Sequence, residues 1–241
     1  MCDGQVGSGI AQWLIDNYPG DVGAVVTVSE NQTYSAARSS GIPSLTYKSE
    51  PELLQSLATL EPIDLGVLAW WPKIISPALI AMPEYGFINT HPSLLPYNRG
   101  KHYNFWALVE QVPFGVSLHY VDEGIDSGDV VAQSTIPYDW EDTGETLYAK
   151  AGHTMVDLFK AVYPKLRAQE LPRITQDLSK GSLHYASEID PASKVDLDKT
   201  YRARDLINLL RARTFSGHPA CWFDDDGATY EIRIKIRKKQ V

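Results

Sequence analysis

The hydrophobic and polar positions of this chain follow two periods, one typical of buried strands and the other of helices. Apolar runs predict short buried strands over 22–28, 63–71 and the end of a strand over 85–88. Helical spacing between turn residues predicts helices over 10–18, 51–60 and 103–110. Strands that alternate with helices predict an α/β fold with a mostly parallel sheet that is covered on both faces.

The second half of the chain predicts a long helix and then a small separate region. Asp142 and Glu145 are spaced as a capping box in front of this helix. The polar stretch 172–198 is expected to connect a domain over 1–171 to a subdomain over 199–241. That subdomain is expected to contain an amphipathic helix and a β-hairpin whose turn is an Asp-Gly pair.

Polar side chains follow the apolar run that ends at Ile88. Asn89 and His91 are two residues apart on extended chain, so both project from one face at the carboxyl end of a strand. Open α/β sheets bind ligands at such ends. A glycine-punctuated acidic turn, 122–129, follows a strand expected over 115–121 and emerges at the same edge. The turn is interpreted as part of a site; a plain solvated turn and a calcium loop are the alternatives, and the ligand order of an EF-hand is absent.

An amide beside an imidazole, with a carboxylate from the next strand, contains no protein nucleophile such as an activated Ser or Cys. The set suits direct transfer of an acyl group between two bound ligands. The amide and the imidazole would stabilise the developing oxyanion, and the carboxylate would orient the imidazole and help to remove a proton from the attacking amine.

Two further stretches lie at predicted strand ends. The glycine-rich segment before the first helix can bring backbone N–H groups to a phosphate, and a tight strand-to-helix turn is an equally good interpretation. The buried strand expected before it is either a stub or lies upstream of Met1. Trp70 and Trp71 either flank a flat heterocyclic ligand, with Lys73 near an anionic group, or belong to the core.

Composition narrows the partners and the compartment. The chain has 241 residues, 44% of them hydrophobic and 22% charged, which is typical of a globular protein. Its net charge of -8 weighs against a nucleic-acid partner. The two cysteines lack disulfide or zinc spacing and favour a reducing cytoplasm, and no metal site is expected. Neither a membrane span nor an export leader is expected from the apolar runs.

The sequence also resembles a known family. The segments Ile88–Pro96, Arg99–Gly100, Gly115–His119 and Asp122–Asp129 closely resemble those of the folate-dependent formyltransferases. The resemblance implies a Rossmann-like catalytic domain, 10-formyltetrahydrofolate as the formyl donor, and a catalytic trio of Asn89, His91 and Asp126. The folate contacts that it implies are Trp71, Pro72, Lys73, Ile74, Ile75, Asp122, Glu123, Gly124 and Ile125. The residues that it implies on the side of the amine-bearing substrate are Gly7, Ser8, Gly9, Tyr97, Asn98, Arg99 and Lys101.

The identity of the amine depends on the last part of the chain. Residues 199–241 resemble the region that follows the catalytic domain in methionyl-tRNA and sugar formyltransferases, without a basic tRNA-binding domain. With the acidic charge, this implies formyl transfer to a nucleotide-linked deoxyamino sugar for surface polysaccharide, by a homodimer formed through the C-terminal region. The alternatives are a methionyl-tRNA formyltransferase-like enzyme, another small-amine formyltransferase, a folate- or nucleotide-binding module without turnover, and a hydrolase that deformylates the donor.

Overall fold

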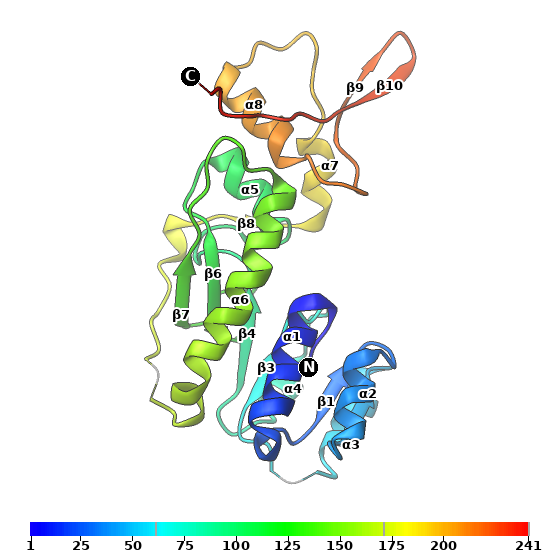
Figure 1. Ribbon diagram of the computed structural model, residues 1–241, viewed down its shortest axis with the longest axis vertical. Helices are drawn as coiled ribbons and strands as arrows, with labels where there is room; N and C mark the ends of the chain where they lie inside the picture. Colours follow the sequence, from blue (N-terminus) through cyan, green and yellow to red (C-terminus); the bar gives the residue numbers. More distant parts are fainter. Residues whose placement is uncertain (61, 171, 241) are drawn as a thin grey trace. The chain divides into compact units, whose positions relative to one another are not determined.

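A mixed sheet carries most of the residues expected at the site. The computed structural model describes residues 1–60, 62–170 and 172–240 (Figure 1). The sheet has the strand order β3 (Gly66–Leu68), β4 (Phe87–His91), β6 (Gly115–Tyr120) and β7 (Val130–Thr135). β3 is parallel to β4, whereas β6 is antiparallel to β4. The α/β class is confirmed, and the antiparallel β6 is the departure from a parallel sheet.

The remaining strands form two-stranded ladders. These pair β1 (Val25–Thr27) with β2 (Ser44–Thr46), β5 (Arg99–Gly100) with β8 (Leu183–His184), and β9 (Cys221–Asp225) with β10 (Ala228–Ile232). The helices are α1 (Gly4–Asn17), α2 (Gln32–Ser39), α3 (Glu50–Leu57), α4 (Pro77–Ile80), α5 (Tyr103–Glu110), α6 (Gly144–Arg167), α7 (Ile189–Ala192) and α8 (Ala203–Ala212). Short 3-10 helices lie at Pro19–Asp21, Leu178–Lys180 and Ala186–Glu188. Within the described ranges, no helix has the length and apolar character needed to cross a membrane.

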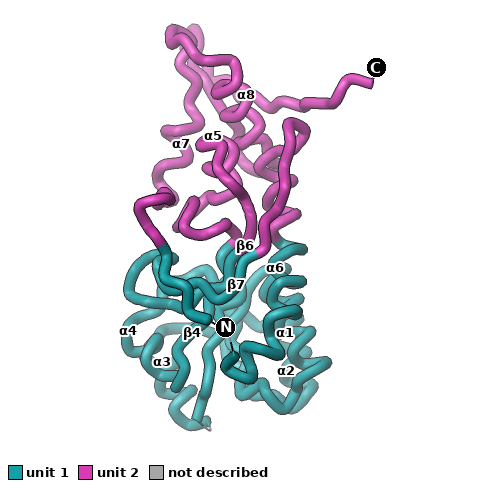
Figure 2. Tube along the Cα trace, turned by 90° about the vertical axis from the view of Figure 1, so that its left-hand side faces the viewer, with its two compact units in different colours: residues 1–91, 117–133, 152–176 teal, residues 92–116, 134–151, 177–241 magenta. Residues whose placement is uncertain are grey.

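The described chain divides into two compact units (Figure 2). Unit 1 contains residues 1–91, 117–133 and 152–176, and unit 2 contains the segments 92–116, 134–151 and the chain from 177 onward. Both units are therefore assembled from segments that are distant in sequence. The sequential domains expected over 1–171 and 199–241 stay a prediction.

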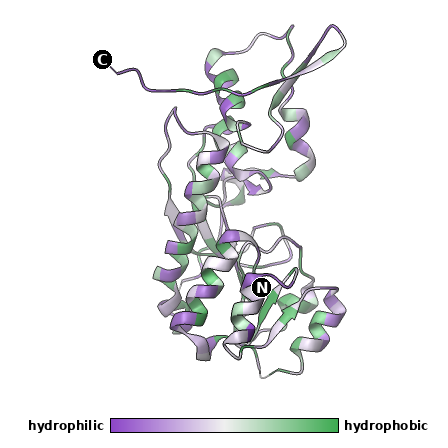
Figure 3. Ribbon diagram, turned by 45° about the vertical axis from the view of Figure 1, so that its right-hand side comes forward, coloured by the Kyte–Doolittle hydropathy of each residue, from purple (hydrophilic) through white to green (hydrophobic). Residues whose placement is uncertain are grey.

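One apolar cluster forms the core around β3 in unit 1. Its members come from strands, from helices and from the loop after β3, and they are Val26, Leu53, Leu57, Leu68, Trp71, Ile75, Leu79 and Phe87. Figure 3 shows the pattern that produces such a core, because most helices carry both hydrophobic and hydrophilic residues along their length. Burial of each large apolar side chain contributes about 1.5–3 kcal/mol.

The first helix begins earlier than the apolar spacing predicts. α1 starts at Gly4, so the glycine-rich segment forms the first turns of the helix and not a loop. A Cβ atom at Gly7 would lie 2.6 Å from the carbonyl oxygen of Ala69. Glycine is needed there because the helix approaches the backbone of the strand end closely.

Several short elements carry no periodic signal and were not predicted. α2 buries only Thr33 and Ala37, β2 has no fully buried residue, and α4 is only a single turn. The stretch 172–198, expected to be an irregular connector, contains β8 and α7, and β8 pairs with β5. Elements of two to four residues are too short to show a hydrophobic period.

The start of α6 corrects the predicted capping box. The backbone N–H of Thr146 donates to Thr143 Oγ1 at 3.3 Å, and the N–H of Thr143 donates to Thr146 Oγ1 at 2.9 Å. The box is therefore formed by Thr143 and Thr146, one residue later than Asp142 and Glu145. Asp142 instead accepts hydrogen bonds from Thr146 Oγ1 and Lys150, both at 2.8 Å.

The C-terminal hairpin agrees with its sequence pattern. β9 and β10 are antiparallel, with Asp225 opposite Ala228. The two turn residues, Asp226 and Gly227, have φ values of 45° and 79°. Two consecutive positive φ values define the type I′ turn that an Asp-Gly pair favours.

Candidate active site

β4 presents Asn89 and His91 on the same face because residues two apart on a strand point the same way. The observed strand includes both residues, whereas the sequence predicted a strand that ends at Ile88. Between them, Thr90 points to the other side, where its Oγ1 donates to Leu68 O at 3.2 Å and accepts the N–H of Trp70 at 3.0 Å. These bonds join β4 to the end of β3.

The acidic turn brings a carboxylate to these two side chains. Asn89 Nδ2 donates to Asp126 Oδ1 at 3.3 Å, and His91 Nδ1 lies 3.2 Å from Asp126 Oδ2. His91 is buried, with a relative exposure of 4%. The structure therefore brings together the amide, the imidazole and the carboxylate of the predicted trio. Their catalytic roles stay a prediction.

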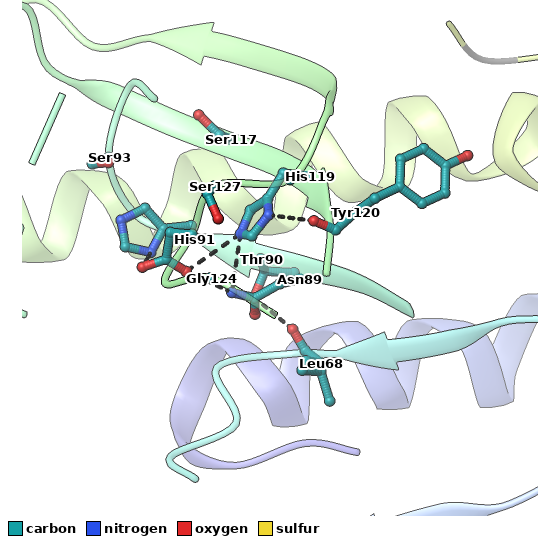
Figure 4. A network of polar contacts seen from close by, with 12 residues as sticks. Leu68, Asn89, Thr90, His91, Ser93, Ser117, His119, Tyr120, Gly124 and Ser127 are labelled. Carbon is teal, nitrogen blue, oxygen red and sulfur yellow. Dashed lines mark hydrogen bonds and ion pairs between the residues drawn. The ribbon is translucent and has the colours of Figure 1, made fainter. Parts of the chain in front are cut away.

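His119 is a fourth member of this cluster that was not included in the predicted site. It lies opposite Asn89 in the β4–β6 register, and its Nε2 is 3.2 Å from Asn89 Nδ2 and 3.4 Å from Asp126 Oδ1. Its Nδ1 is 2.8 Å from the carbonyl oxygen of Tyr120 and therefore donates a hydrogen to it. In the neutral ring, Nε2 is then the acceptor for the Asn89 amide. Figure 4 shows Asn89 and His119 directed toward one another, with His91 in the same network of polar contacts.

The sequence contains a signal for the position of His119, but its interpretation requires the pairing register of the strand that carries this residue. The alternation of 115–121 places His119 on one face of its strand. Only the antiparallel pairing with β4 puts that face beside Asn89. A connection through a helix, as between β4 and β6, favours parallel pairing of the two strands. The alternating pattern of β6 therefore did not predict its antiparallel register with β4.

Backbone contacts hold the acidic turn in place. Gln176 Nε2 donates to the carbonyl oxygens of Asp126 at 3.0 Å and Gly128 at 2.6 Å. Within the turn, Asp122 Oδ1 accepts the N–H of Gly124 at 3.1 Å and the hydroxyl of Ser127 at 2.8 Å. The Asp122 carboxylate therefore closes the turn, in addition to any contact that it makes with a ligand.

The segment that the resemblance implies for folate has buried ends and an exposed middle. Trp71 and Ile75 belong to the apolar core of unit 1, and the Trp71 ring meets the Tyr47 ring at a centroid distance of 5.4 Å. For Trp71, the core alternative is therefore what the structure shows. Pro72, Lys73 and Ile74 are exposed, and Ile74 has a relative exposure of 89%.

Two apolar side chains are exposed in the segments that the resemblance implies for folate. Ile74 lies in the segment after β3, and Ile125 lies in the acidic turn. Both residues belong to unit 1. Trp70, just before the exposed segment, has a φ of 49°, which is strained for a large side chain. Strained backbone beside a polar cluster is common at functional sites.

The residues expected on the side of the second substrate lie in two places. In unit 1, Gly7 is buried within α1, and Ser8 Oγ accepts a hydrogen bond from Thr33 Oγ1 at 2.7 Å. Gly9 lies one residue further along the same helix. The Gly7 N–H donates to the carbonyl oxygen of Asp3 at 3.1 Å. This N–H therefore forms a hydrogen bond of the helix and does not bind a phosphate.

The other predicted substrate residues, Tyr97, Asn98, Arg99 and Lys101, belong to unit 2. Asn98 has a relative exposure of 1%, and its Nδ2 donates to Glu110 Oε2 at 2.8 Å and Ser182 Oγ at 3.3 Å. Its side chain therefore stabilises unit 2 from within. Lys101 is exposed.

The polar cluster, and not a cavity, identifies the site. A cavity of about 1160 Å³ in unit 1 has none of Asn89, His91 and Asp126 in its lining. Its lining combines apolar side chains with polar and charged ones, and it excludes the three polar groups that the sequence predicts to converge at a catalytic site. In the part of the chain that the structure describes, no group of three or more His, Cys, Asp or Glu side chains is arranged to hold a metal ion.

Comparison with solved structures agrees with this fold. The sugar N-formyltransferase from Shewanella sp FDAARGOS_354 is 22% identical and superposes with a TM-score of 0.79 over 99% of this chain and 97% of that chain. The formyltransferase PseJ from Anoxybacillus kamchatkensis, solved with UDP-4,6-dideoxy-4-formamido-L-AltNAc and tetrahydrofolate, is 25% identical, with a TM-score of 0.58. That match covers 78% of this chain and 98% of PseJ.

Sequence comparison identifies the family. A methionyl-tRNA formyltransferase of Synechococcus sp. (strain JA-3-3Ab) is 34% identical over 188 residues, which are 78% of this chain and 55% of that protein. The chain thus spans little more than half the length of the curated relatives that it matches. The model of an N-formyltransferase dimerization C-terminal domain matches residues 188–238, and the model described as Formyl transferase matches residues 16–162. Because the latter match covers more than half of its length, the chain belongs to the formyl transferase family.

Proposed function

We propose that this chain transfers a formyl group from 10-formyltetrahydrofolate to the amino group of a nucleotide-linked deoxyamino sugar for surface polysaccharide. The observation that carries the proposal is the contact of Asn89 and His91 with one carboxylate, that of Asp126. The groups that contact this carboxylate from β4 and β6 are an amide and two imidazoles, and none of these three is a hydroxyl or thiol nucleophile. Such a set favours transfer between two bound ligands over a covalent enzyme intermediate.

In the proposed reaction, the neutral amine of the sugar attacks the formyl carbon, and the formyl oxygen becomes an oxyanion. Collapse of this species breaks the bond between the formyl carbon and the folate nitrogen. The attacking nitrogen loses one proton, and the folate nitrogen gains one. Asp126 assists the proton removal, and its contact with His91 Nδ1 orients the ring beside the oxyanion.

The Asn89 amide couples the two halves of this reaction. A carboxamide has two N–H hydrogens, and those of Asn89 face His119 Nε2 at 3.2 Å and Asp126 Oδ1 at 3.3 Å. Donation to an oxyanion therefore requires one of these contacts to open. Transfer of the amine proton to Asp126 weakens the bond to Oδ1, because a protonated carboxyl is a poorer acceptor. Proton removal thus releases the N–H that stabilises the oxyanion.

The exposed segment after β3 supports a folate site. Pro72 and Ile74 present apolar surface to solvent, and Ile125 at the acidic turn does the same. Exposed apolar surface beside a polar cluster is typical of a ligand site. When it is bound, the donor supplies an activated formyl group. The residues of this chain that would hold it are Pro72, Lys73, Ile74 and the turn over 122–125.

Two observations support the proposed acceptor: the net charge of this chain and the ligands in the structure of one relative. PseJ was solved with a UDP-linked formamido sugar and tetrahydrofolate. The net charge of -8 is unfavourable for binding the phosphate backbone of a tRNA. The curated relatives are nevertheless named methionyl-tRNA formyltransferases, so formylation of methionyl-tRNA is the second candidate function.

We further propose that the enzyme is a cytoplasmic homodimer formed through residues 199–241. The match of 188–238 to a dimerization C-terminal domain supports the dimer. Cys2 and Cys221 are both free and buried, which supports a reducing compartment.

The test is a formyl-transfer assay with separate acceptors. Purified protein and 10-formyltetrahydrofolate are mixed with dTDP-, UDP- or GDP-linked amino sugars, with methionyl-tRNA, or with no acceptor. Tetrahydrofolate release is measured together with the mass of the acceptor. We expect release and a formylated product with at least one sugar nucleotide. Formylation of tRNA alone, release without any acceptor, or folate binding without turnover would each contradict the proposal.

A further inference from the structure

A short ladder in unit 2 contains two of the residues that are predicted on the side of the acceptor. β5 and β8 pair in parallel and have two residues each. The N–H of Arg99 donates to Ser182 O at 3.0 Å, and the N–H of Lys101 donates to His184 O at 2.9 Å. A two-stranded ladder is marginal in water by itself. Side-chain contacts are therefore needed to hold Arg99 and Lys101 in place.

The two strands of this ladder approach each other closely at a glycine. A Cβ atom at Gly100 would overlap the carbonyl oxygen of His184. The φ of Gly100 is 86°, in the region that favours glycine. Because the two backbones are this close, a displacement of β8 at His184 also displaces β5.

The ring of His184 lies against α5. It stacks on the ring of Trp106, with a centroid distance of 3.8 Å and an interplanar angle of 7°. Its Nε2 lies 2.8 Å from Glu110 Oε1. Trp106 and Glu110 are four residues apart and therefore share one face of the helix. The ring thus attaches β8 to that face of α5.

The other ring nitrogen of His184 contacts a second carboxylate. Its Nδ1 lies 2.8 Å from Glu188 Oε2. The hydrogen bond from His184, with one from the backbone N–H of Tyr185, holds the pKa of Glu188 below its ordinary value. Glu188 is therefore an ionised acceptor, and its contact requires a donor at Nδ1.

Glu110 is an acceptor as well. Its Oε2 accepts hydrogen bonds from Asn98 Nδ2 and Ser182 Oγ, both at 2.8 Å, and such bonds favour the ionised carboxylate. Its Oε1 therefore requires a donor at His184 Nε2. A neutral imidazole has one N–H, so only the doubly protonated ring satisfies both carboxylates. The side chain of His184 is 11% exposed, and its two charge-assisted hydrogen bonds are stronger than neutral ones.

The two cations on this ladder are suited to an anionic ligand. The Nε atom of Arg99 is buried and has no hydrogen-bond partner among the described residues. Lys101 is exposed. Guanidinium and ammonium groups bind phosphate oxygens through charge-assisted hydrogen bonds. A nucleotide-linked sugar offers such oxygens in its diphosphate.

We propose that His184 is a positioning residue for the acceptor. Its doubly protonated ring holds β8 on α5, and β8 holds Arg99 and Lys101 for the diphosphate of the sugar nucleotide. The role in acceptor binding rests on the proposed function, whereas the role in holding the ladder does not. The proposed folate contacts belong to unit 1, so the affinity for the donor is independent of His184.

The first test is amide hydrogen exchange in the full chain with His184→Gln, which removes the charge and one of the two donors. We expect exchange at Arg99 and Lys101 to become at least about tenfold faster. Val195 is the internal control in unit 2, because its N–H donates to Trp222 O at 2.8 Å and should exchange at an unchanged rate. His184→Arg restores a charge and several donors and should recover part of the protection.

Unchanged exchange at Arg99 and Lys101 in His184→Gln would overturn the proposal. Equal acceleration at Val195 would do the same, because it would indicate general loss of stability. If His184→Gln fails to fold, Glu188→Gln replaces it, since this variant keeps the ring and removes one carboxylate. Unchanged exchange in that variant also counts against the proposal.

The second test compares the KM values of the two substrates. The acceptor is the dTDP-, UDP- or GDP-linked amino sugar that the parent chain formylates. We expect His184→Gln to raise the acceptor KM about tenfold and to leave the donor KM within about twofold. The matched control is His153→Gln, at an exposed position on α6, which should change neither value.

Equal increases in both KM values, or no increase for the acceptor, would overturn the role of His184 in acceptor binding. If the parent chain formylates no sugar nucleotide, the proposed function fails, and with it the role in acceptor binding. The exchange rates at Arg99 and Lys101 still decide in that case whether His184 holds the ladder.

Discussion

At the scale of single residues, the position of Asp126 determines what the site can do. Its carboxylate contacts Asn89, His91 and His119, which come from two neighbouring strands. Its backbone has a φ of 50°, a conformation that Asp tolerates better than most residues. Gln176 holds the carbonyl oxygen of the same residue. The turn therefore holds this carboxylate at the ends of the strands.

We predict that Asp126→Asn lowers turnover by about 100-fold or more, because an amide keeps the shape of the side chain but accepts no proton. The measurement is the rate of tetrahydrofolate formation at saturating donor and acceptor. The matched control is Asp157→Asn, at an exposed position on α6, which should leave turnover unchanged. Turnover within about threefold of the parent chain in Asp126→Asn would refute the assigned role.

Gln176 is predicted to be a positioning residue for the acidic turn. Gln176→Glu replaces the N–H donor with a carboxylate that repels the carbonyl oxygens of Asp126 and Gly128. We expect kcat to fall about tenfold, because a small displacement of a catalytic group is costly. Gln176→Lys restores a donor and should recover part of the loss. Equal losses in both variants would indicate a packing role only.

At the scale of elements, the residue just before α5 makes unit 2 sensitive to acid. His102 precedes the helix with a φ of 59°. Burial, assisted by the charges of Arg213 and Lys101, lowers its pKa below the ordinary value of 6.5, against the opposing effect of Asp190 and a contact with the backbone of Ala186. As the pH falls, His102 therefore binds a proton at a higher pH in the unfolded chain than in the folded chain. Stability is fully present above 6.5 and is lost as the pH falls toward the lowered folded value.

The variant that tests this effect is His102→Asn, because Asn tolerates positive φ and does not titrate. The free energy of unfolding is measured by urea denaturation at about pH 7.5 and about pH 5.5. The parent chain should lose stability as the pH falls, and about 1.4 kcal/mol per pH unit is the upper limit of the slope from this one group. The variant should lose less over the same interval. An identical pH dependence in both proteins would show that His102 does not contribute.

At the scale of the whole molecule, the charge separates the two candidate acceptors. A net charge of -8 repels a polyanion, whereas a sugar nucleotide carries few charges and binds in a local site. We predict that labelled tRNA binds more weakly than about 100 µM at 0.15 M salt, as measured by fluorescence anisotropy. Micromolar binding with a steep salt dependence would instead favour methionyl-tRNA as the acceptor.

Some features of the fold and site were predictable because they depend only on neighbouring residues. The bounds of α5 follow from local spacing and agree with the prediction over 103–110. The Asp226-Gly227 turn follows from the φ values that these residues permit. Asn89 and His91 share a face because the period of a strand is two residues.

The tertiary structure alone decided the features that depend on distant partners. The place of His119 beside Asn89 depends on the antiparallel register of β4 and β6, and the alternation of one strand does not determine its partner. The contact of Gln176 with Asp126 spans 50 residues and leaves no local pattern. A tryptophan looks the same in the sequence whether it lines a ligand site or packs in a core. For Trp71, only the surrounding apolar side chains decide between these two roles. The sequence by itself thus determined which chemical groups lie at the strand ends, while the pairing of strands decided which of those groups meet.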